Sequence, residues 1–542
     1  MQSRLASSIL IARNPTLKFA ALSIATCVTA SLFFAPDAIA QSKPAQKPAS
    51  KPVVKALAPT PAEIQAKRLK AHLEFIAHDL LEGRDTPSRG LDIAALYLAT
   101  QMKIFGIEPA GDNGTYFQTV KRNSMAIDSA NTFLQIGDKK LKNDVDFDAF
   151  YPPGKIEGEI EYVGFGYRIP SKGIDPYAGR DVRGKILLVL SGTPKGIDPG
   201  DLTREKISDL EYPTDAGANL GAKAILMVPP RSMSAGVTIG GRIPNYILRQ
   251  SGLKALLEGE SLSVDLLQNR IQSGEAGESV TLHASKPAMI QVAFQNTTLE
   301  FKNVVGMVRG TDPVLKNEYV AFGAHYDHVG INGTGADNIW NGADDDGSGT
   351  VSVLEIARAF AYGTKPKRSL LFVWHGGEEK GLWGAEYFVN HPTVPIDKIV
   401  TQLNIDMIGR SRKSGDTNPA NKDLSDENTI YVIGSRMLSD DLGNAIVNAN
   451  NKSVKMRLDY KYDDPKDPER FYYRSDHYHY ASKGIPIAFF FNGVHEDYHG
   501  ADDEVEKIDF KRMETISRLI YGAGWQIANT PARPKVNKKP QP

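Results

Sequence analysis

Two adjacent carboxylates follow an apolar stretch in the second half of the chain. Glu378 and Glu379 belong to the run Gly376–Gly381, which follows Leu370–Trp374 with only His375 between them. That apolar stretch predicts a buried strand, so the pair is expected at the strand's end. On a loop, adjacent side chains can diverge, so one carboxylate can hold a metal ion while its neighbour moves a proton. An exposed acidic pair is the competing interpretation, and the buried strand before it argues against that.

Other metal-binding residue types also stand at the ends of apolar stretches. His325 follows Glu318–Ala324, and a neutral imidazole at the end of a strand is a good zinc ligand. Asp327 is near enough in sequence to hydrogen-bond this ring and fix its tautomer, as metal-bound histidines usually require. Asp406 follows an apolar run, where a buried carboxylate is costly unless a cation compensates it. These positions favour a metal centre.

Two further ligand positions stay open from the residues alone. The turn Asp344–Asp346 precedes Gly-Ser-Gly and a helix pattern, so it either caps that helix or offers a carboxylate that bridges two cations. His499 follows Tyr498 in a polar loop, but spacing does not separate it from three neighbours: His477, His479 and His495. Taken together, five hard or borderline ligands and one free carboxylate are the set that a two-zinc hydrolase needs.

The elements that position these residues follow an α/β pattern from Asn303 onward. Alternating buried strands and amphipathic helices predict a three-layer sandwich, with a mixed, mostly parallel central sheet flanked by helices. In such sheets, sites form at the loops that leave the carboxyl ends of strands, where each chemical motif stands. The expected strands are Val304–Met307, Glu318–Ala324, Ser369–Trp374 and Ile399–Ile405, and the expected helices are Thr350–Ala361 and Lys380–Asn390.

Length and composition indicate a globular protein of several domains. A chain of 542 residues predicts two or three domains of about 150 residues each. At 41% hydrophobic and 24% charged, with zero net charge, the composition is ordinary and gives no argument for nucleic acid. Residues 62–144 are helical in pattern and form the expected N-terminal part of a catalytic domain that continues at 286–528. Residues 145–285 have short β-rich runs and are expected to form an inserted module.

The two ends of the chain have the composition of processing and linking segments. Residues 1–40 combine a basic leader, the apolar run Phe19–Ala35 and the small-x-small site Ala38–Ala40. This pattern predicts a cleavable signal peptide, and hence export to the periplasm or the medium, rather than a membrane anchor. The single cysteine, Cys27, lies within it, so the mature chain has no disulfide or thiolate chemistry. Residues 41–61 read as a Lys/Pro/Ala-rich linker and 529–542 as a disordered tail; no other segment is apolar enough to span a membrane.

Five motifs in order resemble the co-catalytic two-zinc aminopeptidase family, which includes secreted bacterial leucyl aminopeptidases and, more distantly, glutamate carboxypeptidase and transferrin receptor. The resemblance spans about 65–525, and its β-rich insertion resembles a protease-associated domain. A weaker N-terminal match pairs Leu81–Arg84 with Gly106–Gly111. The five motifs are Gly323–His328, Asn341–Gly349, Gly377–Leu382, Asn404–Gly409 and Tyr498-His499.

The resemblance implies a role for each candidate residue. It implies two Zn²⁺ ions bridged by Asp345, the residue three positions before Ser348, with a cis peptide bond to Asp346. Glu378 would be the general base and Tyr498 would donate to the oxyanion of the tetrahedral intermediate. In addition to Asp345, the resemblance implies His325 and Asp406 as ligands of one zinc, and Glu379 and His499 as ligands of the other.

The function expected from this resemblance is an exported zinc-dependent metallo-exopeptidase, an aminopeptidase in the first place, acting on peptides or proteins. A carboxypeptidase or dipeptidase on the same site is the next alternative. A glutaminyl cyclase shares the fold but typically needs one zinc, so the complete ligand set argues against it. A receptor-like binding protein with a relic site should have lost ligands, and this chain keeps them all. No residue is assigned to the substrate's free amine or terminal carboxylate.

Overall fold

The computed structural model describes residues 63–150, 152–231, 241–282, 287–332 and 337–538. The expected signal peptide (1–40) and linker (41–61) lie outside these residues. Among the described helices, none is long and apolar enough to cross a membrane.

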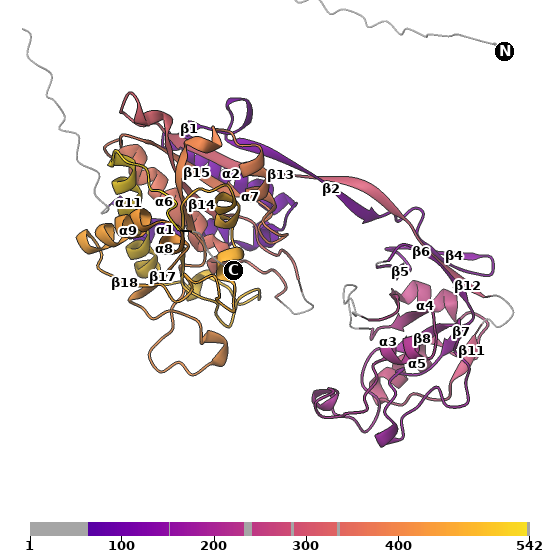
Figure 1. Ribbon diagram of the computed structural model, residues 1–542. Coiled ribbons are helices and arrows are strands. Elements are labelled where there is room, and N and C mark those ends of the chain that lie inside the picture. Colours follow the sequence, from indigo (N-terminus) through magenta and orange to yellow (C-terminus); the bar gives the residue numbers. More distant parts are fainter. Residues whose placement is uncertain (1–62, 151, 232–240, 283–286, 333–336, 539–542) are drawn as a thin grey trace, which may run out of the picture. The chain divides into compact units, whose positions relative to one another are not determined.

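A nine-stranded mixed sheet forms the centre of the α/β part of the chain (Figure 1). Its order is β1-β13-β15-β14-β16-β19-β17-β18, with β2 paired to β13. The four central strands β15, β14, β16 and β19 run parallel to one another and are buried along almost their whole length, as expected for strands covered on both faces. The bounds are β1 Glu108–Pro109, β2 Phe117–Ile127, β13 Phe294–Val308, β14 Tyr319–His325, β15 Ser369–His375, β16 Ile399–Ile405, β17 Thr429–Ile433, β18 Arg457–Asp459 and β19 Ile487–Phe491.

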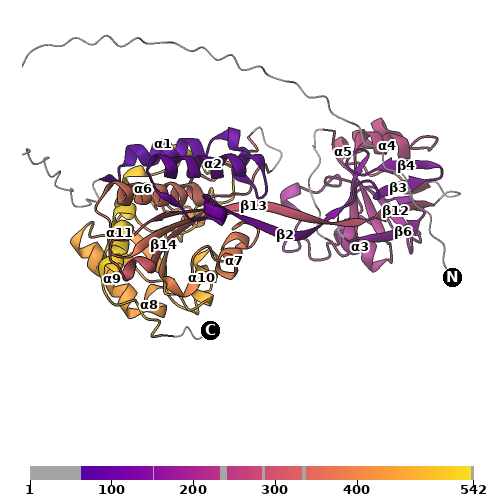
Figure 2. The ribbon, with the colours of Figure 1, turned by 90° about the horizontal axis from the view of Figure 1, so that it is seen from above.

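Helices cover both faces of this sheet, which confirms the predicted three-layer α/β architecture (Figure 2). Alternate residues of β15 serve the two layers: Phe372 and Trp374 pack with one group of helices, and Leu371 and Val373 with the other. The first group is α1 Ala66–Ile76, α2 Arg89–Ile104, α6 Gly349–Tyr362, α9 Asp440–Lys452 and α11 Phe510–Asn529. The second group is α7 Trp383–Asn390, α8 Ser435–Leu438 and α10 His477–Ser482.

The chain leaves the central sheet on β2 and returns to it on β13. These two long strands pair antiparallel from Phe117 opposite Val304 to Ile127 opposite Phe294. Between them lie a six-stranded sheet, β11-β7-β8-β9-β10-β5, and a four-stranded sheet, β4-β3-β12-β6. Strands β3, β4 and β12 fall outside residues 145–285, so the β-rich region is larger than the module expected from sequence; its identity as a protease-associated domain stays a prediction.

The elements of this β-rich region have the following bounds. The strands are β3 Phe133–Ile136, β4 Lys139–Lys142, β5 Phe147–Asp148, β6 Gly154–Gly158, β7 Ile160–Tyr162, β8 Ile186–Leu190, β9 Ala224–Val228, β10 Asn245–Leu248, β11 Val280–Leu282 and β12 Ala288–Val292. The helices are α3 Pro213–Asn219, α4 Gln250–Leu256 and α5 Val264–Ser273.

Two boundaries near the motifs differ from the sequence predictions. His325 is the last residue of β14, not the first residue after the strand. The helix expected from Lys380 begins only at Trp383, because Gly381 and Leu382 take positive φ values of 103° and 62° that a right-handed helix does not allow.

The described residues 529–538, the start of the expected disordered tail, make specific contacts with the rest of the protein. Asn529 still belongs to α11, and the segment after it is tied down by ion pairs. Arg533 pairs with Glu318 at 2.8 Å and Lys538 with Asp440, so the basic residues that suggested a solvated tail instead have acidic partners. The buried Arg368 also donates to the backbone carbonyls of Ile527 and Pro531.

Arg368→Gln tests this anchoring. The variant loses the bonds to the α11 end and to Glu318, which accepts from Arg368 Nε at 2.7 Å, and a buried acceptor left without its donor is costly. We expect a loss of about 2–3 kcal/mol in the free energy of unfolding, measured by denaturant titration. Arg533→Gln is the matched control: its side chain is 39% exposed, so it should lose less than about 1 kcal/mol. Equal losses would contradict a special role for Arg368.

Candidate metal centre

The candidate site lies at the carboxyl edge of the central parallel strands. His325 ends β14, Asp406 directly follows β16, and Glu378 and Glu379 follow β15 after two glycines. Parallel strands bring their carboxyl ends to one edge of a sheet, which gathers these residues although they are far apart in sequence. Asp345 comes from the turn before α6, and His499 from the loop after β19.

Asp345 lies at the centre of the cluster, and its two oxygens face different neighbours. Oδ1 is 3.2 Å from His325 Nε2, and Oδ2 is 3.1 Å from His499 Nε2. Asp406 Oδ2 lies 3.6 Å from His325 Nε2, and Glu379 Oε2 lies 3.0 Å from His499 Nε2. The structure therefore brings the five sequence-predicted ligands together in two groups that share Asp345.

The donor geometry fits metal ions better than hydrogen bonds. His499 Nε2 is buried and close to two carboxylates, yet it makes no hydrogen bond among the described residues. Ligands placed about 2 Å from a tetrahedral ion lie about 3.3 Å from one another, which matches the spacing around His325 and His499. In each group the potential ligand atoms lie within 4.8 Å of one another.

The turn that carries Asp345 is held by buried backbone contacts. The amides of Asp344 and Asp345 both donate to the Asp503 carboxylate at 3.0 Å. The peptide bond between Asp345 and Asp346 is cis, as the family resemblance implies. Asp346 in turn accepts from the backbone amides of His325 and Met407, so it links the ends of two strands.

The two adjacent glutamates point to different parts of the cluster. Glu379 lies in the group with His499, and its second oxygen is 2.9 Å from His328 Nδ1. Glu378 Oε2 is 4.0 Å from His325 Nε2 and belongs to neither ligand group. Burial raises the pKa of Glu378 well above its usual value, and the charges of Glu379 and Asp406 add to this effect. A carboxyl of this kind suits proton transfer near neutral pH.

The loop that carries Glu378 is held at successive backbone amides. Gly377 donates to Thr86 Oγ1 at 3.1 Å, and Glu378 donates to Asp327 Oδ1 at 3.2 Å. Thr86 also donates to the other Asp327 oxygen at 2.9 Å. Asp327 thus orients the loop, while its backbone carbonyl, 3.2 Å from His325 Nδ1, orients the imidazole. Sequence reasoning expected Asp327 to orient His325 but missed its contact with Glu378 and the role of Thr86.

A buried arginine from the N-terminal segment joins the loops around the site. Arg84 donates to the carbonyls of Tyr326, Asn341 and Gly342 at 2.9, 2.7 and 3.1 Å. Burial lowers its pKa to about 10, against the opposing effect of nearby aspartates, so it stays charged at neutral pH. Gly83, the residue before it, has a φ of +66°, and a Cβ there would lie 2.5 Å from the Gly330 carbonyl oxygen. Position 83 of the N-terminal motif Leu81–Arg84 therefore requires glycine for steric reasons.

Tyr498 lines a cleft beside the ligands. Burial and the charges of Asp345 and Glu379 raise the pKa of its phenol, so the hydroxyl keeps its proton. Arg474 Nη2 lies 3.5 Å from this hydroxyl and was missed from sequence, because no pattern linked it to a motif. Apolar side chains complete the cleft: Met407, Phe471, Phe489, Phe491 and Val494.

The other candidate histidines lie outside both groups. His477 Nε2 is 2.8 Å from the Tyr472 carbonyl oxygen, and His495 Nε2 is 3.4 Å from Asp344 Oδ2. Among the described residues, neither belongs to a group that could hold a metal ion, and neither does His479. By contrast, His328 joins the group of His499; it stands in a quoted motif, but sequence reasoning gave it no role.

Comparison with known proteins gives a family match for the part of the chain that carries this site. Residues 303–523 match the family model described as "Peptidase family M28". The chain is 30% identical over 231 residues to a "Probable leucine aminopeptidase" of Arthroderma benhamiae, covering 41% of this chain and 57% of the relative. It is 24% identical over 430 residues to "Aminopeptidase YwaD" of Bacillus subtilis, covering 74% of this chain and 79% of the relative. The chain thus spans little more than half the length of the first of these relatives.

A solved structure supports the fold. The zinc aminopeptidase BSAP from Bacillus subtilis aligns with a TM-score of 0.50 at 19% identity, covering 86% of this chain and 96% of that chain. At this identity the likeness establishes the α/β fold, and the chemistry has to be argued from the residues themselves.

Arg84→Lys tests whether the buried arginine positions the site. Lysine keeps the charge but lacks the planar fork that reaches several carbonyls, so we expect a loss of about 2–4 kcal/mol in the free energy of unfolding together with weaker metal binding. Denaturant titration and metal titration measure the two effects. Arg89→Lys is the control, since that side chain is 73% exposed. Unchanged metal affinity in a folded Arg84→Lys protein would refute the positioning role.

Proposed function

We propose that this chain, which belongs through residues 303–523 to peptidase family M28, is an exported zinc-dependent aminopeptidase. The observation that carries the proposal is the placement of Asp345, whose two oxygens face His325 and His499, beside a glutamate that belongs to neither ligand group. This arrangement provides two adjacent cation sites and a free base, as hydrolysis of an amide requires.

The ligand assignment follows the two groups of side chains. We assign His325 and Asp406 to one zinc, Glu379 and His499 to the other, and Asp345 to both. His328 contacts the outer oxygen of Glu379 at 2.9 Å, and we assign it the role of orienting that ligand, as outer partners of metal-bound carboxylates commonly do. Two bound zinc ions would polarise the scissile carbonyl and bring the pKa of water toward neutrality.

The protein's own groups carry out the proton transfers. Glu378 takes a proton from the attacking water and then gives it to the leaving amine; its raised pKa suits both steps. Tyr498 keeps its phenol proton and donates it in a hydrogen bond to the oxygen that becomes negative in the tetrahedral intermediate. Arg474, next to that hydroxyl, orients Tyr498 and adds positive charge.

We choose cleavage at the amino end of a peptide as the proposed activity, because relatives of the chain are named aminopeptidases. A carboxypeptidase or dipeptidase remains the second candidate on the same residues. Digestion of a defined peptide library, followed by mass spectrometry, distinguishes them: loss of residues from the amino end supports the proposal, and loss from the carboxyl end supports the alternative. No cleavage by the zinc-loaded protein would favour a receptor-like binding protein.

Export and the identity of the inserted region are parts of the same proposal. Residues 1–40 have the pattern of a cleavable signal peptide, so the enzyme would act in the periplasm or the medium. Amino-terminal sequencing of protein recovered from the native host tests this: a mature chain that begins at Gln41 supports cleavage after Ala40. The region between β2 and β13 is proposed to be a protease-associated domain.

Glu378→Gln tests the general base. The amide keeps the shape of the side chain but cannot accept the water proton, so kcat on an aminoacyl amide should fall by about 10²–10⁴-fold. Zinc content by elemental analysis should stay the same, because Glu378 lies in neither ligand group. Full turnover by this variant would rule out the assigned role.

Glu379→Ala tests the neighbouring ligand. Removal of this carboxylate leaves His499 and Asp345 to hold the second ion, so the variant should bind fewer zinc ions per chain than the parent and lose activity. Glu386→Ala is the control, since this glutamate is 44% exposed on α7 and pairs with Arg122. An unchanged zinc stoichiometry in Glu379→Ala would show that Glu379 is not a ligand.

A further inference from the structure

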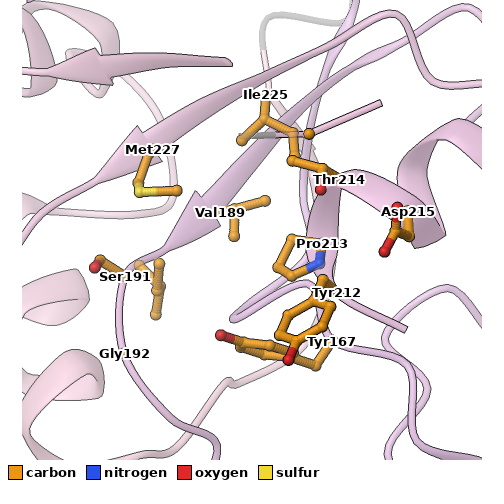
Figure 3. A pocket seen from close by; sticks show the side chains of 12 residues that line it. Tyr167, Val189, Ser191, Gly192, Tyr212, Pro213, Thr214, Asp215, Ile225 and Met227 are labelled. Carbon is orange, nitrogen blue, oxygen red and sulfur yellow. The ribbon is translucent and has the colours of Figure 1, made fainter. Parts of the chain in front are cut away.

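The β-rich region between β2 and β13 contains a cavity of about 370 Å³ (Figure 3). Its lining comes from β9, the carboxyl end of β8, the start of α3 and the loop after β7. Strands β7, β8, β9 and β10 are parallel, and crevices at the carboxyl ends of parallel strands are common ligand sites. None of the lining residues belongs to the proposed metal centre.

The floor of this cavity is apolar, and its side chains are buried. Val189 of β8 and Ile225 and Met227 of β9 contribute side chains on one face of the sheet. On the same face, Leu187 and Ile225 also pack with Ala216 of α3. Helix α3 has only seven residues, so it leaves the cavity beside it. A ligand above this floor would therefore cover mainly the half-buried Tyr167, Tyr212 and Pro213, and burial of apolar surface contributes about 25 cal/mol per Å².

The side walls are aromatic. The rings of Tyr167 and Tyr212 lie 6.1 Å apart and are tilted to each other by 59°, and Pro213 follows Tyr212 along the same wall. The Tyr212 hydroxyl donates to the Leu202 carbonyl at 3.2 Å, which holds the ring in place. Such a wall presents a rigid flat surface to a bulky apolar group.

The polar groups of the lining indicate a neutral ligand. Asp215, the one acidic residue of the lining, is paired with Arg204, so the cavity offers no unpaired charge. The hydroxyls of Tyr167, Ser191 and Thr214 have no hydrogen-bond partner among the described residues. They are suited to neutral amide groups, which both donate and accept hydrogen bonds.

We propose that this cavity binds one bulky apolar side chain of an extended polypeptide, with the flanking amide groups hydrogen-bonded to the free hydroxyls. A free amino acid fits less well, because its charged amine and carboxylate would meet no opposite charge, whereas a residue within a chain has neutral amide groups on both sides. The choice of a polypeptide rests on the proposed peptidase function, which supplies such chains as substrates. The cavity would hold a polypeptide substrate at a position remote in sequence from the bond that is cut.

Binding of blocked peptides to the full-length protein tests this proposal. The probes are short peptides, acetylated at the amino end and amidated at the carboxyl end, with a central Leu or Phe in a Gly/Ser sequence. Calorimetry should detect binding of these probes, and replacement of the central residue by Ala or Lys should weaken it by about tenfold or more, as expected when a buried side chain is truncated or charged. N-acetyl-leucine amide should bind more weakly than the peptides, because it lacks the further amides.

Ser191→Trp fills the cavity from its rim and should weaken binding of the Leu and Phe probes by about tenfold or more. Ser273→Trp, at the exposed end of α5, is the matched control and should bind like the parent. Thr214→Val, which removes one hydroxyl with little change of shape, is expected to cause a smaller loss. Thermal unfolding confirms that each variant is folded.

Three outcomes would overturn the proposal. They are absence of binding of any apolar probe to the parent protein, equal binding by a folded Ser191→Trp protein, and binding of N-acetyl-leucine amide as tightly as the peptides. Hydrolysis of a small aminoacyl amide is measured in parallel and should be unchanged in Ser191→Trp. If the parent protein does not hydrolyse the aminoacyl amide, this result contradicts the proposed function and not the proposal that the cavity binds a polypeptide.

Discussion

The concentration of buried negative charge around Asp345 is the constraint on which the rest of the structure depends. Asp345, Asp346, Glu378, Glu379 and Asp406 are gathered at one edge of the sheet, and carboxylates this close repel one another unless cations or donors compensate them. His499 lies among these carboxylates: burial disfavours its protonation, but its contacts with Asp345 and Glu379 raise its pKa to about 10. Divalent cations would supply the same compensation with the ligands already in place.

Fixed backbone donors and the buried Arg84 surround these carboxylates. Asp503 accepts from the turn that carries Asp345, and Asp327 accepts from the loop that carries Glu378. Arg84 brings a positive charge from the N-terminal segment and ties three loop carbonyls. These residues position the backbone around the ligand atoms without being ligands themselves, and Arg84 ties the N-terminal segment to the loops of the site.

Much of the site could be predicted from sequence because its residues sit at the ends of strongly apolar strands. The apolar runs predicted the bounds of β15 and β16 to within one residue. The motif resemblance selected Asp345 and His499 from neighbours that spacing alone could not separate. The contacts of Arg84, Thr86, His328 and Arg474 were missed because they depend on side chains that meet across long sequence separations. The ion pairs of Arg533 with Glu318 and of Lys538 with Asp440 were missed for the same reason.

The pairing of β2 with β13 makes the whole β-rich region equivalent to the loop of a hairpin. Ile127 and Phe294 are direct partners at the far end of the ladder, so their Cα atoms lie about 5 Å apart, a gap that a two-residue turn closes in an ordinary hairpin. The central sheet therefore has the same connectivity with or without the region between them. A short turn at this position would leave the strands that carry the metal centre connected as they are, so the metal centre and the β-rich region can be altered independently.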